Sequence, residues 1–294
     1  MCVIVAKYFP GIGWAGAKNR DRTYIPTLDF IIDDVGDTER VMMHDQVTGY
    51  REGLNSHGVS ILNTSLDVLD DEREVAAGTV ESSPDGKYIA EALLEKDPLA
   101  AVKVLIKQKL VGCTIVFNQE DLYLIEASDQ DGARPYRYMV KHIPHDQIVA
   151  RTNHGKWLEW SGFQRGRKDT ETMDRISSES RLVQAEEVVQ DAKQPTDLVD
   201  GMCKIYIDNP QLNILRTSTE RKKMRTTSQQ LCVPQERTLY CRPVSSNLQF
   251  DFWKLNKPNR NTWVELLSNR ELWNTTKKKQ PFDTVKLKDV EDES

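Results

Sequence analysis

The sequence predicts an α+β fold in which antiparallel sheets carry helices on their outer faces. Runs rich in β-branched and aromatic residues occur at the start, in the middle and near the end of the chain. Most neighbouring runs are joined by short turns, which predict hairpins, and helical spacing of apolar residues is found in stretches between them. This order of strands, helices, strands, helices and strands favours antiparallel sheets over a doubly wound parallel sheet.

The first strands are expected close to the start of the chain. Residues 2–8 are rich in β-branched and aromatic types, and the turn signal Pro10-Gly11 leads to a second short strand at 16–21. Residues 53–58 are expected to form a turn before a strand at 59–63, whose end is polar.

Two helices and a hairpin are expected next. Apolar residues recur at helical spacing over 86–111, and the spacing is broken at Asp97-Pro98. Proline suits the first turn of a helix, so a second helix should begin there. Residues 113–128 then predict a hairpin with its turn at 118–121.

The second half of the chain predicts further helices and strands. After a strand at 148–150, a helix is expected to open at Ser177 and to end before Pro195, and Thr196 should cap another helix at 197–206. Further strands are expected at 228–232, 238–243 and 248–255. Residues 160–176 look like a polar excursion. We expect one domain over 1–276 and a flexible tail over 277–294.

Composition narrows the class of protein. The 294 residues include 40 basic and 45 acidic side chains, which gives a formal charge of −5. A nucleic-acid binder needs a basic excess to displace counterions from phosphates, so that class is excluded. No run approaches the roughly 18 apolar residues of a membrane helix, and no leader pattern is visible. We expect a cytoplasmic protein with a small-molecule partner and no membrane partner; a homo-oligomer stays open.

Neither cofactors nor metals are expected. No phosphate-binding glycine loop is visible, and His142 and His145 are the one near-spaced histidine pair. The five cysteines are an odd number without a CxxC pair, which predicts free, buried thiols. A disulfide between Cys232 and Cys241, which flank a hairpin-like turn, is the alternative.

Cys2 is the first candidate for catalysis. Cysteine is small enough for the initiator methionine to be removed, which would make Cys2 the mature N-terminus. An α-amine with a pKa of about 7.7–8.0 would then lie beside the thiol and could take and return its proton without a histidine. The alternative is that Cys2 is merely a small residue before a strand.

Three further side chains could complete such a site. Asp21 ends the second expected strand, where its carboxylate could orient the Cys2 amine. Asn63 and Asn153 each follow or end a strand and could stabilise an oxyanion, a contribution of about 3–4 kcal/mol per donor. The alternatives are a solvated turn for Asp21 and ordinary turn formers for the two asparagines.

Several short motifs occur in a characteristic order. They are Met1-Cys2, Lys18-Asn19-Arg20-Asp21, Gly53-Leu54-Asn55 with Gly58-Val59 and Asn63, Arg151-Thr152-Asn153-His154, Ser180-Arg181-Leu182-Val183-Gln184-Ala185, and Thr227-Ser228 with Thr238-Leu239-Tyr240-Cys241-Arg242. The ordered set covers some 250 residues. It resembles the N-terminal nucleophile (Ntn) hydrolases that cleave linear amides, among them choloylglycine hydrolases, penicillin V acylases, acid ceramidase-like amidases and the isopenicillin N acyltransferase branch. Asn19-Arg20-Asp21 near a Met-Cys start is also similar to NRDE proteins.

The resemblance implies a fold, a reaction and a set of site residues. The fold would be a four-layer αββα sandwich, two antiparallel sheets between helical layers. Cys2 would be nucleophile and base, Asp21 the partner of the α-amine, and Asn63 and Asn153 the oxyanion site. A late arginine near the sulfur would be Arg216, with Arg225 as the alternative. Bile-salt hydrolases carry arginine where this chain has Lys18, which keeps the charge but not bidentate donation.

The expected reaction is cleavage of a linear carboxamide, an N-acyl amine or N-acyl amino acid, through a thioester on Cys2. An acyltransferase with an amine acceptor and a non-catalytic binding or assembly protein are the alternatives. The acyl group should contact apolar segments at 24–30, 66–69 and 157–163, which include Tyr24, Leu66 and Trp157. Lys18 and Arg20 are expected to favour an anionic leaving amine.

Overall fold

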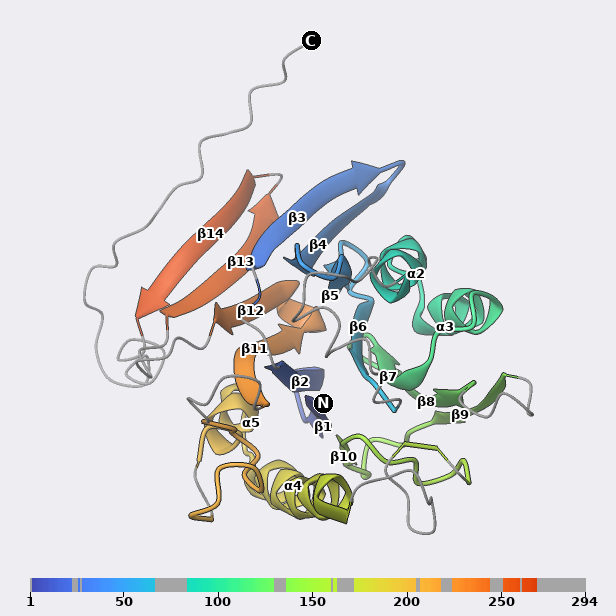
Figure 1. Ribbon diagram of the computed structural model, residues 1–294. Helices are drawn as coiled ribbons and strands as arrows, with labels where there is room; N and C mark the ends of the chain where they lie inside the picture. Colours follow the sequence, from blue (N-terminus) through green and yellow to red (C-terminus); the bar gives the residue numbers. More distant parts are fainter. Residues whose placement is uncertain are drawn as a thin grey trace.

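The computed structural model places two antiparallel sheets face to face, with helices on the outer face of each (Figure 1). The structure describes residues 2–22, 26, 28–66, 84–129, 136–159, 161–162, 172–204, 207–217, 224–243, 251–259 and 261–268. Both sheets and the helices that cover them fall in these ranges.

The first sheet has seven strands in the order β10-β1-β2-β11-β12-β13-β14, all paired antiparallel. Their bounds are β1 Cys2–Phe9, β2 Gly13–Arg22, β10 Val149–Arg151, β11 Arg225–Val233, β12 Thr238–Pro243, β13 Asp251–Asn259 and β14 Asn261–Ser268. Every residue of β2 is buried, because the second sheet covers one of its faces and helices cover the other. The first two strands are therefore the centre of the molecule.

The second sheet also has seven antiparallel strands, in the sequential order β3 to β9. Their bounds are β3 Leu28–Val35, β4 Thr38–Asp45, β5 Tyr50–Asn55, β6 Ser60–Thr64, β7 Gly112–Phe117, β8 Leu122–Ser128 and β9 Arg137–His142. Because neighbours in sequence are neighbours in space, short connections suffice except between β6 and β7. Residues 65–111 separate those two strands and contain helices α2 and α3.

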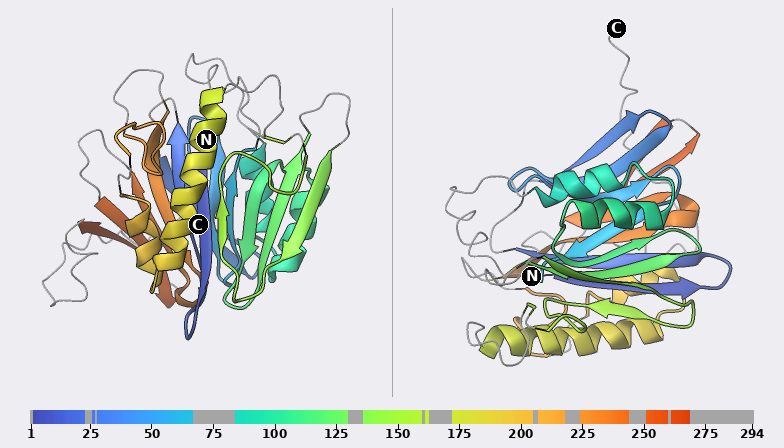
Figure 2. Two further views of the ribbon diagram at one scale, coloured as in Figure 1. Left: turned by 90° about the horizontal axis from the view of Figure 1, so that it is seen from below. Right: turned by 90° about the vertical axis from the view of Figure 1, so that its right-hand side faces the viewer.

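Helices form the two outer layers of a four-layer αββα sandwich (Figure 2). Helices α2 (Asp85–Ala92) and α3 (Pro98–Lys107) pack on the second sheet, and α4 (Thr172–Asp191) and α5 (Pro195–Gly201) pack on the first. Three apolar clusters fill the spaces between layers, one between the sheets and one under each helical pair. The α+β class and the layer order predicted from the sequence are confirmed.

Most predicted elements are present. The break at Asp97-Pro98 is real, since the Asp97 side chain accepts a hydrogen bond from Ala100 N (2.9 Å) and Pro98 opens α3. The hairpin over 113–128 and its turn are confirmed, as are strands at the start of the chain, at 148–150 and around 228–243. The predicted strand at 248–255 falls partly outside the described residues, and β13 begins at Asp251.

Several predictions were wrong in detail. Residues 53–55 lie in β5 and not in a turn; a Cβ on Gly53 would sit 2.0 Å from Val41 O, so glycine is needed for close strand approach. Helix α4 opens at Thr172 and not at Ser177. Helix α5 is capped by Gln194, in a reciprocal pair with Asp197, and not by Thr196.

Strands β3, β4, β9 and β14 were not predicted. The acidic residues of β3 interrupt its apolar pattern, and β9 is largely exposed, so neither has the buried alternation that identifies a strand. Most of the excursion at 160–176 and the whole tail at 277–294 lie outside the described residues.

Candidate active site

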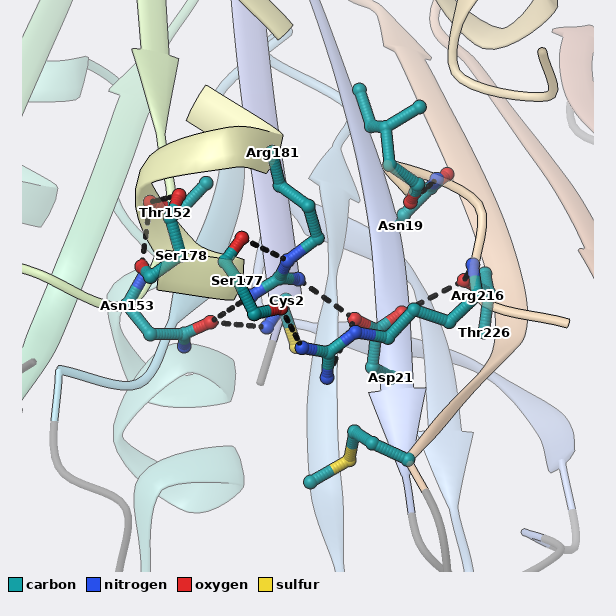
Figure 3. Close-up of polar contacts among 12 residues, drawn as sticks. Cys2, Asn19, Asp21, Thr152, Asn153, Ser177, Ser178, Arg181, Arg216 and Thr226 are labelled. Atoms are coloured by element: carbon teal, nitrogen blue, oxygen red, sulfur yellow. Dashed lines mark hydrogen bonds and ion pairs between the residues drawn. The ribbon is translucent and has the colours of Figure 1, made fainter. Parts of the chain in front are cut away.

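Four of the predicted site residues, Cys2, Asp21, Asn153 and Arg216, meet where β1 begins, beside the end of β2, β10 and the first half of α4 (Figure 3). Cys2 opens β1 and pairs with Arg20 of β2. Alternate side chains of a strand point to opposite faces, so the Cys2 thiol shares the inter-sheet face with Ile4, whereas Asp21 shares the helical face with Ala17. The site therefore spans both faces of the first sheet.

Cationic side chains surround the Cys2 thiol, whose residue is 2% exposed. Arg22 Nη1 donates to Cys2 Sγ at 3.6 Å and to Asp21 O at 2.8 Å. Burial by itself raises the pKa of the thiol, but the charges of Lys18 and Arg22 act against it and the net effect is a lowered pKa. The thiolate, the nucleophilic form, is thus favoured.

The other buried cysteines behave differently. Burial raises the pKa of the Cys232 and Cys241 thiols. All five cysteines are free, so the predicted free thiols are confirmed and the alternative disulfide is absent. Among the cysteines with a shifted pKa, Cys2 is the one whose pKa is lowered.

The nitrogen of Cys2 is held by Asn153. Cys2 N donates to Asn153 Oδ1 at 3.0 Å; with Met1 in place this is a peptide nitrogen, and after removal of Met1 it would be the α-amine. Asn153 Nδ2 donates to Ser65 O at 2.6 Å and to Thr64 Oγ1 at 3.2 Å. Both of its amide hydrogens are engaged in these contacts, so the oxyanion role of Asn153 stays a prediction.

Asp21 is fully buried and neutralised by two arginines. Arg181 Nη1 donates to Asp21 Oδ2 at 2.9 Å, and Arg216 Nη1 lies 3.7 Å from the same oxygen. Thr226 Oγ1 donates to Oδ1 at 2.8 Å. Of the two late arginines considered, Arg216 is the one that pairs with Asp21, and its Nη2 also donates to Ser177 Oγ.

Arg181 of α4 links Asp21 to the Cys2 nitrogen. Its Nη2 donates to Asn153 Oδ1 at 3.1 Å, the oxygen that also accepts from Cys2 N. Burial, with the nearby Arg216 charge, lowers the Arg181 pKa, and Asp21 opposes that effect. The motif around Arg181 belongs to the family resemblance, but the sequence alone predicted no role for this arginine. The signal in the sequence was a positively charged side chain within a segment that predicts a helix.

Asn63 makes its contacts within the second sheet. Tyr50 Oη donates to Asn63 Oδ1 at 3.2 Å, and Asn63 Nδ2 donates to Thr114 Oγ1 at 2.8 Å. Thr64, the next residue, is the one that reaches Cys2, through a 3.4 Å hydrogen bond from its Oγ1 to Cys2 O. Among the described contacts, Thr64 makes a hydrogen bond to Cys2, and the oxyanion role of Asn63 stays a prediction.

Lys18 and Arg20 lie between the sheets in a buried charge cluster. The cluster comprises Lys18, Arg20, Asp45, Tyr50 and Glu52. Lys18 Nζ donates to both carboxylate oxygens of Glu52 at 2.7 Å, and Arg20 Nη2 donates to Asp45 Oδ2 at 3.0 Å. The Tyr50 ring faces both cations, at 4.9 Å and 4.3 Å. Burial lowers the Lys18 pKa, while the Glu52 charge opposes the shift. Both cations are buried, so neither is exposed to solvent where it could meet an anionic leaving amine.

The segments predicted to contact the acyl group lie in different surroundings. Leu66 is fully buried in the inter-sheet apolar cluster. Trp157 is half-buried, packs against that cluster and lines a cavity of about 490 Å³ at the β10 edge. Tyr24, like Trp160 and Phe163, lies outside the described residues.

The described residues include neither a metal site nor a helix that could cross a membrane. No group of three or more His, Cys, Asp or Glu side chains among them could hold a metal ion. None of the described helices is long and apolar enough to cross a membrane. Two histidines contact hydroxyl groups: His57 Nε2 lies 3.1 Å from Thr38 Oγ1, and His154 Nδ1 lies 2.9 Å from Ser178 Oγ.

The fold and the site define an α+β sandwich with a buried cysteine at the start of a central strand. No protein-family model matches the sequence, and no curated protein matches it. Among solved structures, the chain is similar to penicillin V acylase from Agrobacterium tumefaciens, with a TM-score of 0.47 and 11% identity over 97% of this chain and 100% of that one. It is also similar to the C2A mutant of conjugated bile acid hydrolase from Clostridium perfringens, with a TM-score of 0.47 and 8% identity over 92% and 93% of the two chains.

Proposed function

We propose that this chain is an N-terminal-cysteine amidohydrolase that cleaves a linear carboxamide through a thioester. The observation that carries the proposal is the environment of Cys2. Its thiol has a pKa lowered by Lys18 and Arg22, and its nitrogen donates to Asn153. A nucleophile and the atom that would become its base are thus held on one residue.

In the proposed first step the Cys2 sulfur attacks the carbonyl carbon of the amide. The α-amine, exposed by removal of Met1, takes the thiol proton and gives it to the leaving nitrogen as the C–N bond breaks. This releases an amine and leaves an acyl group on sulfur. Water then attacks the thioester, with the α-amine accepting its proton, and the departing thiolate is restored to the thiol as the acid leaves.

Asn153, Arg181 and Asp21 would position the amine. Asn153 Oδ1 accepts from the Cys2 nitrogen, and Arg181 donates to that same oxygen and to Asp21. Asp21 thus supports the amine through Arg181 and Asn153. A direct contact of Asp21 with the amine was expected from the sequence, whereas its described contacts are to Arg181, Arg216 and Thr226.

The test is amide cleavage by wild type, Cys2→Ala and Cys2→Ser with a set of N-acyl amino acids. Wild type should release the free amino acid. Cys2→Ala should be inactive yet folded, and Cys2→Ser should keep only traces because a hydroxyl ionises far less than a thiol. Cys113→Ala, at another buried free cysteine, is the control for general damage. Full activity in Cys2→Ala would refute the proposal.

A further inference from the structure

A cavity of about 490 Å³ lies between β8 and β9 of the second sheet and β10 at the edge of the first. Its size suits a small organic ligand. Buried residues Leu124, Ile143 and Val149 supply apolar walls, and Arg151 is buried too. The exposed Lys141 and Lys156 also line it, so the cavity extends from solvent to the buried edge of the sandwich.

The cavity lining carries positive charge. Arg151, Lys141 and Lys156 contribute three cations. Glu126, the buried carboxylate beside them, already accepts from Arg151 Nε at 3.3 Å and from the backbone nitrogens of residues 156, 157 and 158 at 2.7–3.2 Å. Lys156 pairs with Glu186 at 2.9 Å. Within the described residues, Lys141 makes no ion pair, so its ammonium group is available to pair with an anionic ligand.

An indole ring lies beside these cations. Lys141 Nζ lies 4.1 Å from the centre of the Trp157 ring, and the Arg151 guanidinium carbon lies 4.8 Å from it. The two cation–π contacts lie against the Trp157 ring, and the Trp157 backbone nitrogen donates to Glu126 at 2.7 Å. The ring therefore offers a flat apolar surface with cationic groups next to it.

We propose that this cavity binds a small organic anion, an aryl or alkyl body with one carboxylate. The body would contact Trp157 and the buried aliphatic walls, and the carboxylate would pair with Lys141 and Arg151. The basic recognition that the sequence suggested for Lys18 and Arg20 is better placed here, because those two are buried and paired with Glu52 and Asp45. The inference does not depend on the proposed amide cleavage.

Calorimetric titration of full-length Cys2→Ala, which cannot turn over a substrate, tests the proposal. The probes are naphthalene-2-carboxylate and the uncharged naphthalene-2-carboxamide, which have nearly the same shape. The carboxylate should bind about tenfold tighter, the effect of one charge-assisted contact of about 1.4 kcal/mol. Absence of binding, or equal affinity for the two probes, would overturn the proposal.

Adding Lys141→Met should lower carboxylate affinity toward that of the amide, since Arg151 remains, whereas Lys103→Met should leave it unchanged. Both lysines are exposed, and Lys103 lies on α3 away from the cavity lining. Equal effects of the two substitutions would contradict a site at Lys141.

In wild type, slower iodoacetamide labelling of Cys2 with naphthalene-2-carboxylate bound would identify the anion as part of the amide substrate or its acid product. Unchanged labelling with tight binding would identify it as a separate organic acid.

Discussion

At the scale of single residues, the thiol of Cys2 and the ammonium of Lys18 are coupled through space. Lys18 lowers the Cys2 pKa, and Glu52 holds Lys18 in place with two 2.7 Å hydrogen bonds. Removing Lys18 alone would leave the buried charge of Glu52 with the longer 3.9 Å contact to Arg20 as its ion pair. The pair therefore has to be replaced together.

The double variant Lys18→Met/Glu52→Gln should move the pH profile of Cys2 alkylation to higher pH. The reason is that the thiolate loses a stabilising cation, which raises its pKa. Iodoacetamide labelling rates between pH 5 and 10, followed by mass spectrometry of the Cys2 peptide, measure the shift. Lys96→Met/Asp37→Asn removes an exposed ion pair and should leave the profile unchanged. A profile of the first variant that stays in place or moves to lower pH would contradict the coupling.

Only some of the site residues could be predicted from the sequence. Cys2, Asp21, Asn153 and Arg216 form one contact network, as the ordered motifs suggested. Asn63 and Thr64 are adjacent in sequence, and side chains of adjacent strand residues face opposite ways. A shift of one residue therefore decides which of them reaches Cys2, and sequence spacing has no such precision.

At the scale of elements, helix α4 contributes to the site as much as the strands do. Arg181 projects from it to Asp21 and Asn153 with no exposed surface. Arg175 lies on the same helix, but its contact with Glu179 is 4.0 Å long and both side chains are partly exposed. The two arginines are a matched pair for testing what burial does to an ion pair.

Arg181→Met should lower the free energy of unfolding by about 3–5 kcal/mol, because it leaves Asp21 buried with one weaker partner. Arg175→Met should change it by less than about 1 kcal/mol. Urea unfolding followed by circular dichroism compares them. Similar losses in the two variants would show that the Asp21 contacts contribute little to the fold.

Strand β5 offers a second test at this scale. Gly53→Ala would place a Cβ 2.0 Å from Val41 O and 2.9 Å from Met42 Cα, so β4 and β5 would have to separate. Gly36→Ala at the β3–β4 turn meets no atom within 4 Å, but its φ of +66° is left-handed and costs about 1 kcal/mol. Gly53→Ala should therefore lose clearly more stability in the same urea assay. The reverse order would contradict the close packing of β4 on β5.

The elements were predictable where patterning is strong. The helices break at Asp97-Pro98 because proline and a capping aspartate coincide there, and the hairpin at 113–128 has buried residues in both strands. Strands β3 and β9 are stabilised by their pairing in the sheet more than by their own composition, which a local pattern cannot show. Gly53 was misread because glycine marks both turns and close strand contacts.

At the scale of the whole molecule, the four layers bring distant parts of the sequence to one site. Residues 2, 21, 153, 181 and 216 come from two neighbouring strands, the segment after β10, helix α4 and the segment before β11. The sequence predicted the layers, through the order of elements and the family resemblance, but not the register that joins these segments. The register depends on side-chain packing across the sandwich, which is a property of the complete fold.

Apolar surface between the sheets predicts the preferred acyl group. Leu66 and Trp157 belong to the inter-sheet apolar cluster or pack on it. Leu66 is fully buried, so the acyl chain is expected to contact the half-buried Trp157, where each added methylene should contribute about 0.8 kcal/mol, or roughly tenfold per pair of carbons. The kcat/KM of N-acyl glycines from acetyl to decanoyl should rise in that manner until the space is filled. A flat or falling series would contradict apolar recognition of the acyl group.

The central claim is that Cys2 is an N-terminal nucleophile, and intact-mass spectrometry tests it most directly. The purified protein should be lighter than the full sequence by one methionine residue. After brief reaction with an N-acyl amino acid and acid quenching, it should be heavier by one acyl group, which peptide mapping locates on the Cys2 sulfur. A protein that keeps Met1, or that remains unacylated while releasing the amino acid, would contradict the account.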